Sequence, residues 1–68
     1  MVELYSTGCP KCNVLKKKLE SKGVEFILID NPEYVLLKAN ELNLLTVPFL
    51  IMEDGRVLTF EQAIKEFE

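Results

Sequence analysis

Histidine and tryptophan are absent from this sequence, and cysteine occurs only twice, at Cys9 and Cys12. A structural zinc site needs four ligands, most often cysteine or histidine, so one copy of the chain cannot build a Cys/His zinc site. A metal or cluster shared between two copies stays open as an alternative. Within one copy we expect no metal and no cofactor, which leaves the two thiols for other chemistry.

Long apolar runs are also missing. Residues 26–29 and 49–52 are among the longest uninterrupted runs, whereas a membrane-spanning helix needs about 20 apolar residues. The first residues contain no basic leader followed by an apolar stretch, so we expect no signal peptide. These absences favour a soluble protein of the cytoplasm, with no membrane partner. Thiols are kept reduced there, and closely spaced cysteines are more often reactive than structural.

Positive charge is scarce as well. The chain has 8 lysine and arginine residues against 11 acidic ones, which gives a formal net charge of −3. Proteins that bind nucleic acids carry basic patches that face the phosphates, so we expect no nucleic-acid partner. Half of the basic residues fall between Lys11 and Lys18, and we interpret that run as the solvated face of a helix.

The pattern of apolar residues and turn signals predicts one domain over residues 1–68, near the lower size limit for a fold without disulfides or metals. The predicted order is strand, helix, strand, helix, strand, strand, helix (βαβαββα). The predicted strands are 2–5, 24–30, 48–52 and 56–58. The predicted helices are 10–22, 32–42 and a last helix that begins after residue 59.

Helix ends are marked by capping signals. Cys9 lies where an N-cap belongs, and Pro10 suits the first helical position because its missing N–H has no helical partner there. Gly23 and Asn43 are suited to the left-handed conformation that ends many helices. Thr59, with a glutamine three residues later, matches a capping box.

The element order predicts an α/β fold with a four-stranded mixed sheet. The first two strands must be parallel and joined by a right-handed crossover. The last two strands must be antiparallel, because Asp54-Gly55 is a strong hairpin signal. We expect the first and third helices on one face of the sheet and the second on the other. The apolar run 26–29 suggests a strand buried on both faces. The apolar side of the second helix is expected to consist of Val35, Leu36, Ala39 and Leu42.

Cys9-Pro10-Lys11-Cys12 is the pattern that carries chemistry. A cysteine at a helix N-cap receives unpaired N–H groups and the positive end of the helix dipole, and both favour the thiolate. We therefore predict that Cys9 attacks disulfides. Cys12 lies one turn further on, is expected to be more buried and less ionised, and is suited to resolve the mixed disulfide. Two inert core cysteines are the alternative, but a Pro-containing turn before a helix is a poor place for a core residue.

Together with Thr46-Val47-Pro48, this pattern resembles the glutaredoxins and glutaredoxin-like redoxins of the thioredoxin superfamily, over nearly the whole chain. The resemblance implies a minimal thioredoxin fold and a cis peptide bond before Pro48. It also implies that the backbone of Val47 pairs with the substrate. The substrate-binding surface is accordingly expected to include Pro10, Lys11, Thr46, Val47 and Pro48.

Two departures from the family affect glutathione. The loop before Cys9 lacks the lysine or arginine that glutaredoxins use for a glutathione carboxylate. Leu58-Thr59-Phe60 stands where a Gly-Gly pair normally helps to hold the glutamyl end. Glutathione is therefore expected to be a poor partner. In thioredoxins a buried acid near the position of Glu3 assists proton transfer, but we interpret Glu3 as a solvated strand residue.

The sequence thus predicts an enzyme or electron carrier that cycles a Cys9–Cys12 disulfide with protein disulfide substrates. We expect a monomer that is reduced by a protein such as a thioredoxin reductase rather than by glutathione. Two other classes stay open: a dimer that holds an iron–sulfur cluster through Cys9, and a thioredoxin-fold domain that only binds partners.

Overall fold

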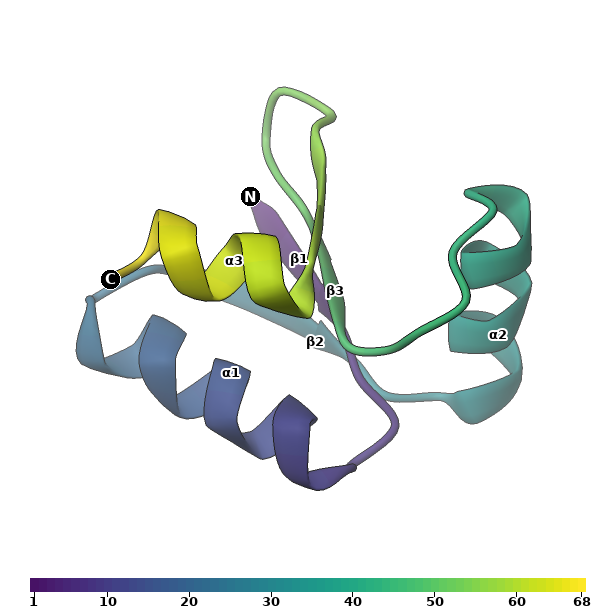
Figure 1. The fold of residues 1–68 in the computed structure, drawn as a ribbon, viewed down its shortest axis with the longest axis horizontal. Helices are drawn as coiled ribbons and strands as arrows, with labels where there is room; N and C mark the ends of the chain where they lie inside the picture. The colour runs from purple at the N-terminus through teal and green to yellow at the C-terminus, as the bar shows by residue number, and fades with distance from the viewer.

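The structure is a computed structural model that describes all residues of the chain, 1–68. Seven elements follow the predicted order (Figure 1). They are β1 (Val2–Tyr5), α1 (Pro10–Ser21), β2 (Phe26–Ile29), α2 (Pro32–Glu41), β3 (Phe49–Ile51), β4 (Val57–Thr59) and α3 (Phe60–Glu66).

The four strands form one mixed sheet in the order β2-β1-β3-β4. β1 pairs with β2 in parallel, and β1–β3 and β3–β4 are antiparallel pairs. The hairpin between β3 and β4 turns at Gly55, whose positive φ of 91° suits glycine. This α/β architecture, with three helices and a mixed sheet, is the predicted one and is compatible with a thioredoxin-like fold.

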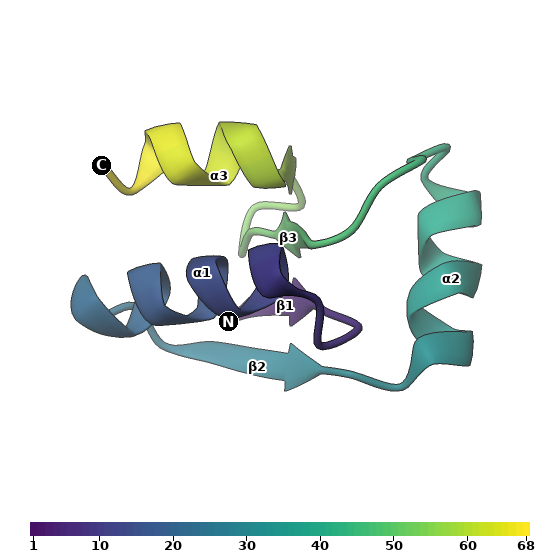
Figure 2. The same ribbon diagram turned by 60° about the horizontal axis from the view of Figure 1, so that its bottom comes forward.

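Successive side chains of a strand point to opposite faces of the sheet, so Leu4 and Tyr5 belong to different cores. Leu4 packs with Leu15 and Leu19 of α1 and with Ala63 of α3. Tyr5 packs with Phe49, Val35 and Ala39, the last two from α2. The predicted placement of α1 and α3 on one face and of α2 on the other is therefore confirmed. Figure 2 shows that α2 stands at the end of the sheet and covers only that end of its face.

The prediction that strand 26–29 is buried on both faces is wrong. β2 is an edge strand of the sheet, and Ile27 and Leu28 are 47% and 39% exposed. Ile27 pairs with Glu3 of β1 and so lies on the face of the sheet that α2 covers only at one end (Figure 2).

The expected apolar side of α2 is also partly wrong. Val35 and Ala39 are buried, but Leu36 is 59% exposed, and Leu42 is half-buried. Leu36 lines a hollow together with Leu44 and Leu45 of the loop that follows α2, and Leu45 is fully exposed. No helix in the structure combines the length and apolar character that crossing a membrane requires.

Most of the capping signals act as the sequence predicts. Gly23 and Asn43 both take positive φ angles, 69° and 58°, directly after the C-cap residues of α1 and α2. At α3, Thr59 and Gln62 make both bonds of the capping box: Gln62 N–H donates to Thr59 Oγ1 at 3.4 Å and Thr59 N–H to Gln62 Oε1 at 3.1 Å. α1 ends at Ser21 rather than at residue 22, and β2 to β4 differ from the expected bounds by one or two residues at their ends.

Candidate active site

Cys9 is the N-cap of α1, as predicted, and Pro10 fills the first helical position. The N-cap backbone is extended, with φ −71° and ψ 165°. This conformation turns the Cys9 side chain back over the first turn, where its Sγ accepts a hydrogen bond from the backbone N–H of Cys12 at 3.3 Å. An unpaired helix donor therefore points at the sulfur, which stabilises negative charge there.

The two cysteine sulfurs lie 2.7 Å apart, as free cysteines that share a hydrogen bond. Cys12 is 1% exposed, whereas Cys9 is half-buried. The prediction that Cys12 is the more buried cysteine is confirmed. Cys9 is consequently the sulfur that a partner reaches first, and Cys12 is held in position to react with Cys9.

Burial and hydrogen bonding act in opposite directions on the pKa of Cys12. Burial raises the pKa of the Cys12 thiol, but hydrogen bonds with Cys9, with the Ser6 side chain and with the backbone at Thr7 lower it by more, so the net direction is down. The prediction that Cys12 is the less ionised cysteine considered burial alone, and it stays a prediction. The close contact makes the two thiols titrate as a pair, and the first proton lost belongs to that pair.

Ser6 holds the loop that supports the pair. It is the buried polar residue of the chain, and its N–H donates to the carbonyl of Ile29 at 3.0 Å. Its Oγ accepts the N–H of Gly8 at 3.1 Å, and Gly8 takes a positive φ of 81°. The loop thus ties the end of β1 to β2 and delivers the chain to Cys9. Sequence reasoning assigned Ser6 no role, because its contact with Ile29 forms only when β1 and β2 pair.

Val47-Pro48 is a cis peptide bond, as the family resemblance implied. Pro48 is fully buried, while Val47 is half-buried and Thr46 is exposed. Neither the N–H nor the C=O of Val47 takes part in a backbone hydrogen bond within the chain. This backbone is therefore free to pair with an extended partner.

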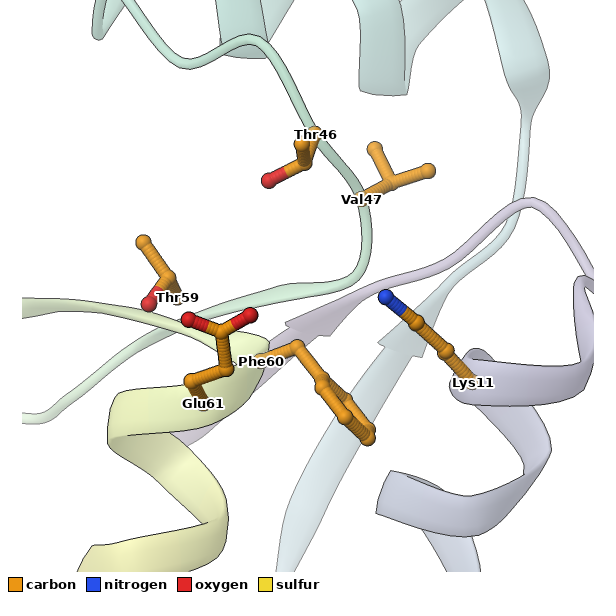
Figure 3. Close-up of a pocket in the computed structure, with 6 residues that line it drawn as sticks. All are labelled: Lys11, Thr46, Val47, Thr59, Phe60 and Glu61. Atoms are coloured by element: carbon orange, nitrogen blue, oxygen red, sulfur yellow. The ribbon is translucent and has the colours of Figure 1, made fainter.

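A pocket of about 210 Å³ lies beside the start of α1 (Figure 3). Its lining consists of Lys11, Thr46, Val47, Thr59, Phe60 and Glu61. Three of these were predicted for substrate binding: Lys11, Thr46 and Val47. Pro10 and Pro48 were predicted too but do not line the pocket: Pro10 is exposed at the start of α1, and Pro48 is buried directly before β3.

The residues that sequence reasoning did not assign to the pocket come from the start of α3. The Lys11 ammonium lies 5.5 Å from the centre of the Phe60 ring, a cation–π contact that joins α1 to α3. Figure 3 shows the Glu61 carboxylate on the side of the pocket opposite Lys11. Glu61 takes part in no salt bridge within the chain. The signal that could have found these residues is their position directly after the hairpin.

Glu3 does not belong to this site. It is half-buried rather than solvated, and it accepts a hydrogen bond from the hydroxyl of Tyr5 at 2.9 Å. Its neighbour Leu4 points to the face that α1 covers, so Glu3 points to the opposite face, away from the cysteines. Burial, followed by the contact with Glu3, raises the pKa of Tyr5 well above its ordinary value.

No cluster of three or more potential metal-ligating side chains occurs in the structure. Comparison with known protein families and with curated proteins found no match to this chain. The function must therefore be argued from the geometry of the cysteine pair and the surfaces around it.

Proposed function

We propose that this protein is a thioredoxin-fold dithiol–disulfide oxidoreductase, similar to the glutaredoxin-like redoxins, that acts in the cytoplasm on protein disulfides. The observation that carries the proposal is the Cys9–Cys12 pair itself: two free sulfurs 2.7 Å apart at the start of α1, one half-buried and one buried. A pair in this state can move from dithiol to disulfide without a large rearrangement of the chain.

In the first step the Cys9 thiolate attacks one sulfur of a substrate disulfide. A Cys9–substrate disulfide forms, the substrate S–S bond breaks, and the other substrate sulfur leaves as a thiolate. Hydrogen bonding from the Cys12 N–H at 3.3 Å stabilises the attacking thiolate. The free N–H and C=O of Val47 supply backbone partners for the residue next to the substrate sulfur.

In the second step Cys12 attacks the Cys9 sulfur and releases the second substrate thiolate. The Cys9–Cys12 disulfide now holds the two oxidising equivalents that the substrate has lost. The hydrogen bonds at Cys12 from the Ser6 side chain and the backbone at Thr7 do not depend on the Cys9 thiol, and they lower the pKa of Cys12 and so favour its thiolate for this attack. A protein reductase of the thioredoxin reductase type returns the pair to the dithiol, and the protein acts as a monomer.

Reduction of insulin disulfides tests the proposal, with thioredoxin reductase and NADPH or the glutathione system as the electron donor. We expect turnover by the unaltered protein and none above background by Cys9→Ser. The Cys12→Ser variant is expected to stop at a mixed disulfide with its substrate. Insulin reduction by Cys9→Ser at the rate of the unaltered protein would overturn the assignment.

A further inference from the structure

β2 leaves one long side without a partner strand. The sheet order β2-β1-β3-β4 gives β2 only β1 as a neighbour, and Figure 2 shows no element beyond it on the other side. The C=O of Ile29 accepts the N–H of Ser6 and therefore faces β1. Because successive residues of a strand direct these groups to alternate sides, Phe26 and Leu28 direct their N–H and C=O groups outward. The outward side of Phe26–Ile29 is here called the open edge.

The open edge lacks the features that usually prevent strand pairing. Native edge strands are protected by proline, charged side chains or bulges. β2 contains only apolar residues and pairs with β1 without a bulge over its 4 residues. Ile27 and Leu28 are 47% and 39% exposed. The opposite border of the sheet differs, because β4 follows the charged Arg56, runs directly into α3, and has only half-buried residues.

Ile27 lies in the middle of the open edge and makes it complementary to a second copy of itself. It lies on the face of the sheet that α2 covers only at one end. An antiparallel pair of two β2 strands, with Phe26 of one copy opposite Leu28 of the other, would satisfy all of the outward N–H and C=O groups of these residues. The two Ile27 residues would then face each other as a non-hydrogen-bonded pair, in which side chains approach most closely.

The acidic residues that flank β2 favour the antiparallel pair over a parallel one. Glu25 precedes the strand and Asp30 follows it, and both are exposed. A parallel pair in register would bring each acid beside the same acid of the other copy, and like charges beside each other are destabilising. In the antiparallel pair Glu25 lies opposite Ile29 of the other copy, and Asp30 lies opposite Val24. No acidic residue of β2 or its flanks then faces another directly.

The same register brings opposite charges together beyond the strand ends. Lys22 is the C-cap residue of α1, Glu33 lies in the first turn of α2, and both are exposed. Neither side chain takes part in a salt bridge within the chain. Continued past the strand, the antiparallel pair places Lys22 of one copy level with Pro32 of the other, next to Glu33. The open edge therefore has charge complementarity to itself at both ends.

We propose that the open edge binds a second copy of this chain, with the two β2 strands antiparallel and centred on Ile27. The two sheets become one continuous sheet, and the pairing closes because both open edges are used. With 4 residues of β2 from each copy, the interface is small, which is typical of weak and reversible association. Each copy keeps its own Cys9–Cys12 pair at the start of α1. A single copy therefore remains the unit of the proposed dithiol chemistry, and the inference does not depend on that chemistry.

Sedimentation equilibrium of the reduced protein measures the association. We expect the mean mass to rise from 7.8 kDa toward twice this value as the concentration increases from about 10 µM to about 1 mM. Ile27→Lys places two like charges opposite each other at the centre of the pair, so this variant is expected to keep the monomer mass throughout.

Leu45→Lys is the matched control, because it makes the same change of charge at another exposed apolar side chain, in the loop after α2 and outside the open edge. This variant is expected to associate as the unaltered protein does. The monomer mass at every concentration in the unaltered protein, or equal association by Ile27→Lys, would overturn the inference. So would masses that grow beyond that of a dimer, since the proposed pairing closes at two copies.

Cross-linking tests the register of the two strands in a chain that also carries Cys9→Ser and Cys12→Ser. Ile27→Cys then places two thiols in a non-hydrogen-bonded pair, where a Cα–Cα distance of about 4.5 Å allows a disulfide. With oxidised glutathione as the oxidant, we expect this variant to form a covalent dimer faster than Leu28→Cys, because Leu28 lies opposite Phe26 of the other copy. Equal rates for the two variants, or a faster reaction of Leu28→Cys, would overturn the proposed pairing.

Discussion

The backbone N–H of Cys12 donates a hydrogen bond to the sulfur of Cys9 across the first turn of α1, at 3.3 Å. Two residues between the cysteines make this contact possible, because the N-cap side chain reaches the N–H of the third helical residue. The same turn brings the two sulfurs to 2.7 Å. One local structure therefore stabilises charge on Cys9 and places Cys12 for attack on it.

Alkylation should distinguish the two cysteines. Cys9 is half-buried and Cys12 is 1% exposed, so a thiol reagent reaches Cys9 first. We expect brief treatment with iodoacetamide at mildly acidic pH to modify Cys9 in preference to Cys12, as read by mass spectrometry of peptides. The Cys9→Ser variant should react more slowly than Cys12→Ser. Preferential labelling of Cys12 would contradict this assignment of roles.

The stability of the reduced protein should depend on pH through Cys12. Burial raises the pKa of this thiol and hydrogen bonds lower it by more, so the folded value lies below the ordinary 9.0. The unfolded chain therefore binds the proton more tightly. The resulting stabilisation is complete above about pH 9 and is lost as pH falls through the lowered pKa.

Urea unfolding of the reduced protein at several pH values up to 9 measures this effect, with Cys12→Ser as the comparison. Stability should rise with pH more steeply in the unaltered protein than in the variant. Measurements stop at pH 9 because burial raises the pKa of Tyr5. The folded protein therefore loses stability as the pH rises past 10.0, the ordinary pKa of tyrosine. Identical pH dependence in both proteins would show that Cys12 binds its proton equally well in the folded and the unfolded chain.

Loss of the capping box should weaken α3. Thr59 Oγ1 accepts the N–H of Gln62, and Thr59→Ala leaves this donor without its partner. We expect a decrease of about 0.5–2 kcal/mol in the free energy of unfolding, measured in urea. Thr59→Ser keeps a hydroxyl group and should retain most of the stability. An alanine variant as stable as the serine variant would mean that solvent satisfies the N–H group equally well.

Glutathione should bind weakly. Its two carboxylates need cations or free N–H groups. The pocket beside α1 offers one lysine, Lys11, which already lies over the Phe60 ring. The Glu61 carboxylate also lines this pocket and would repel the carboxylates of glutathione. An exposed ion pair contributes about 0.2–1 kcal/mol, whereas millimolar affinity needs about 4 kcal/mol. Titration followed by backbone amide shifts should show no saturation below millimolar glutathione. Saturable shifts at Val47 and Thr59 in that range would disprove this prediction.

Local signals allowed much of the fold to be predicted from the sequence. Cys9 and Thr59 cap helices through bonds within one turn, and Asp54-Gly55 turns a hairpin within a few residues. The contact between the two cysteines follows the same logic, since it forms between the N-cap and the first turn of α1. These features need no knowledge of distant parts of the chain.

The predictions that failed concern features that depend on how elements far apart in the sequence pack together. The run 26–29 could not reveal an edge strand, because strand order is decided by β1 and β3. Leu36 continues the apolar pattern of α2, yet it is 59% exposed because α2 stands at the end of the sheet. The pocket residues Phe60 and Glu61 meet Lys11 only when α3 packs beside α1. The lowered pKa of Cys12 arises first from the hydrogen bond with Cys9 and then from Ser6, which the loop places beside the sulfur.

The central claim is that Cys9 and Cys12 exchange two electrons with a substrate disulfide. Its most direct test mixes the reduced protein with a peptide disulfide, quenches with acid, and counts both products by mass spectrometry. We predict one Cys9–Cys12 disulfide formed for each substrate disulfide reduced, a stable Cys9–substrate adduct in Cys12→Ser, and no reaction in Cys9→Ser. Substrate reduction without an equal amount of Cys9–Cys12 disulfide would contradict the account. So would substrate reduction by Cys9→Ser at the level of the unaltered protein.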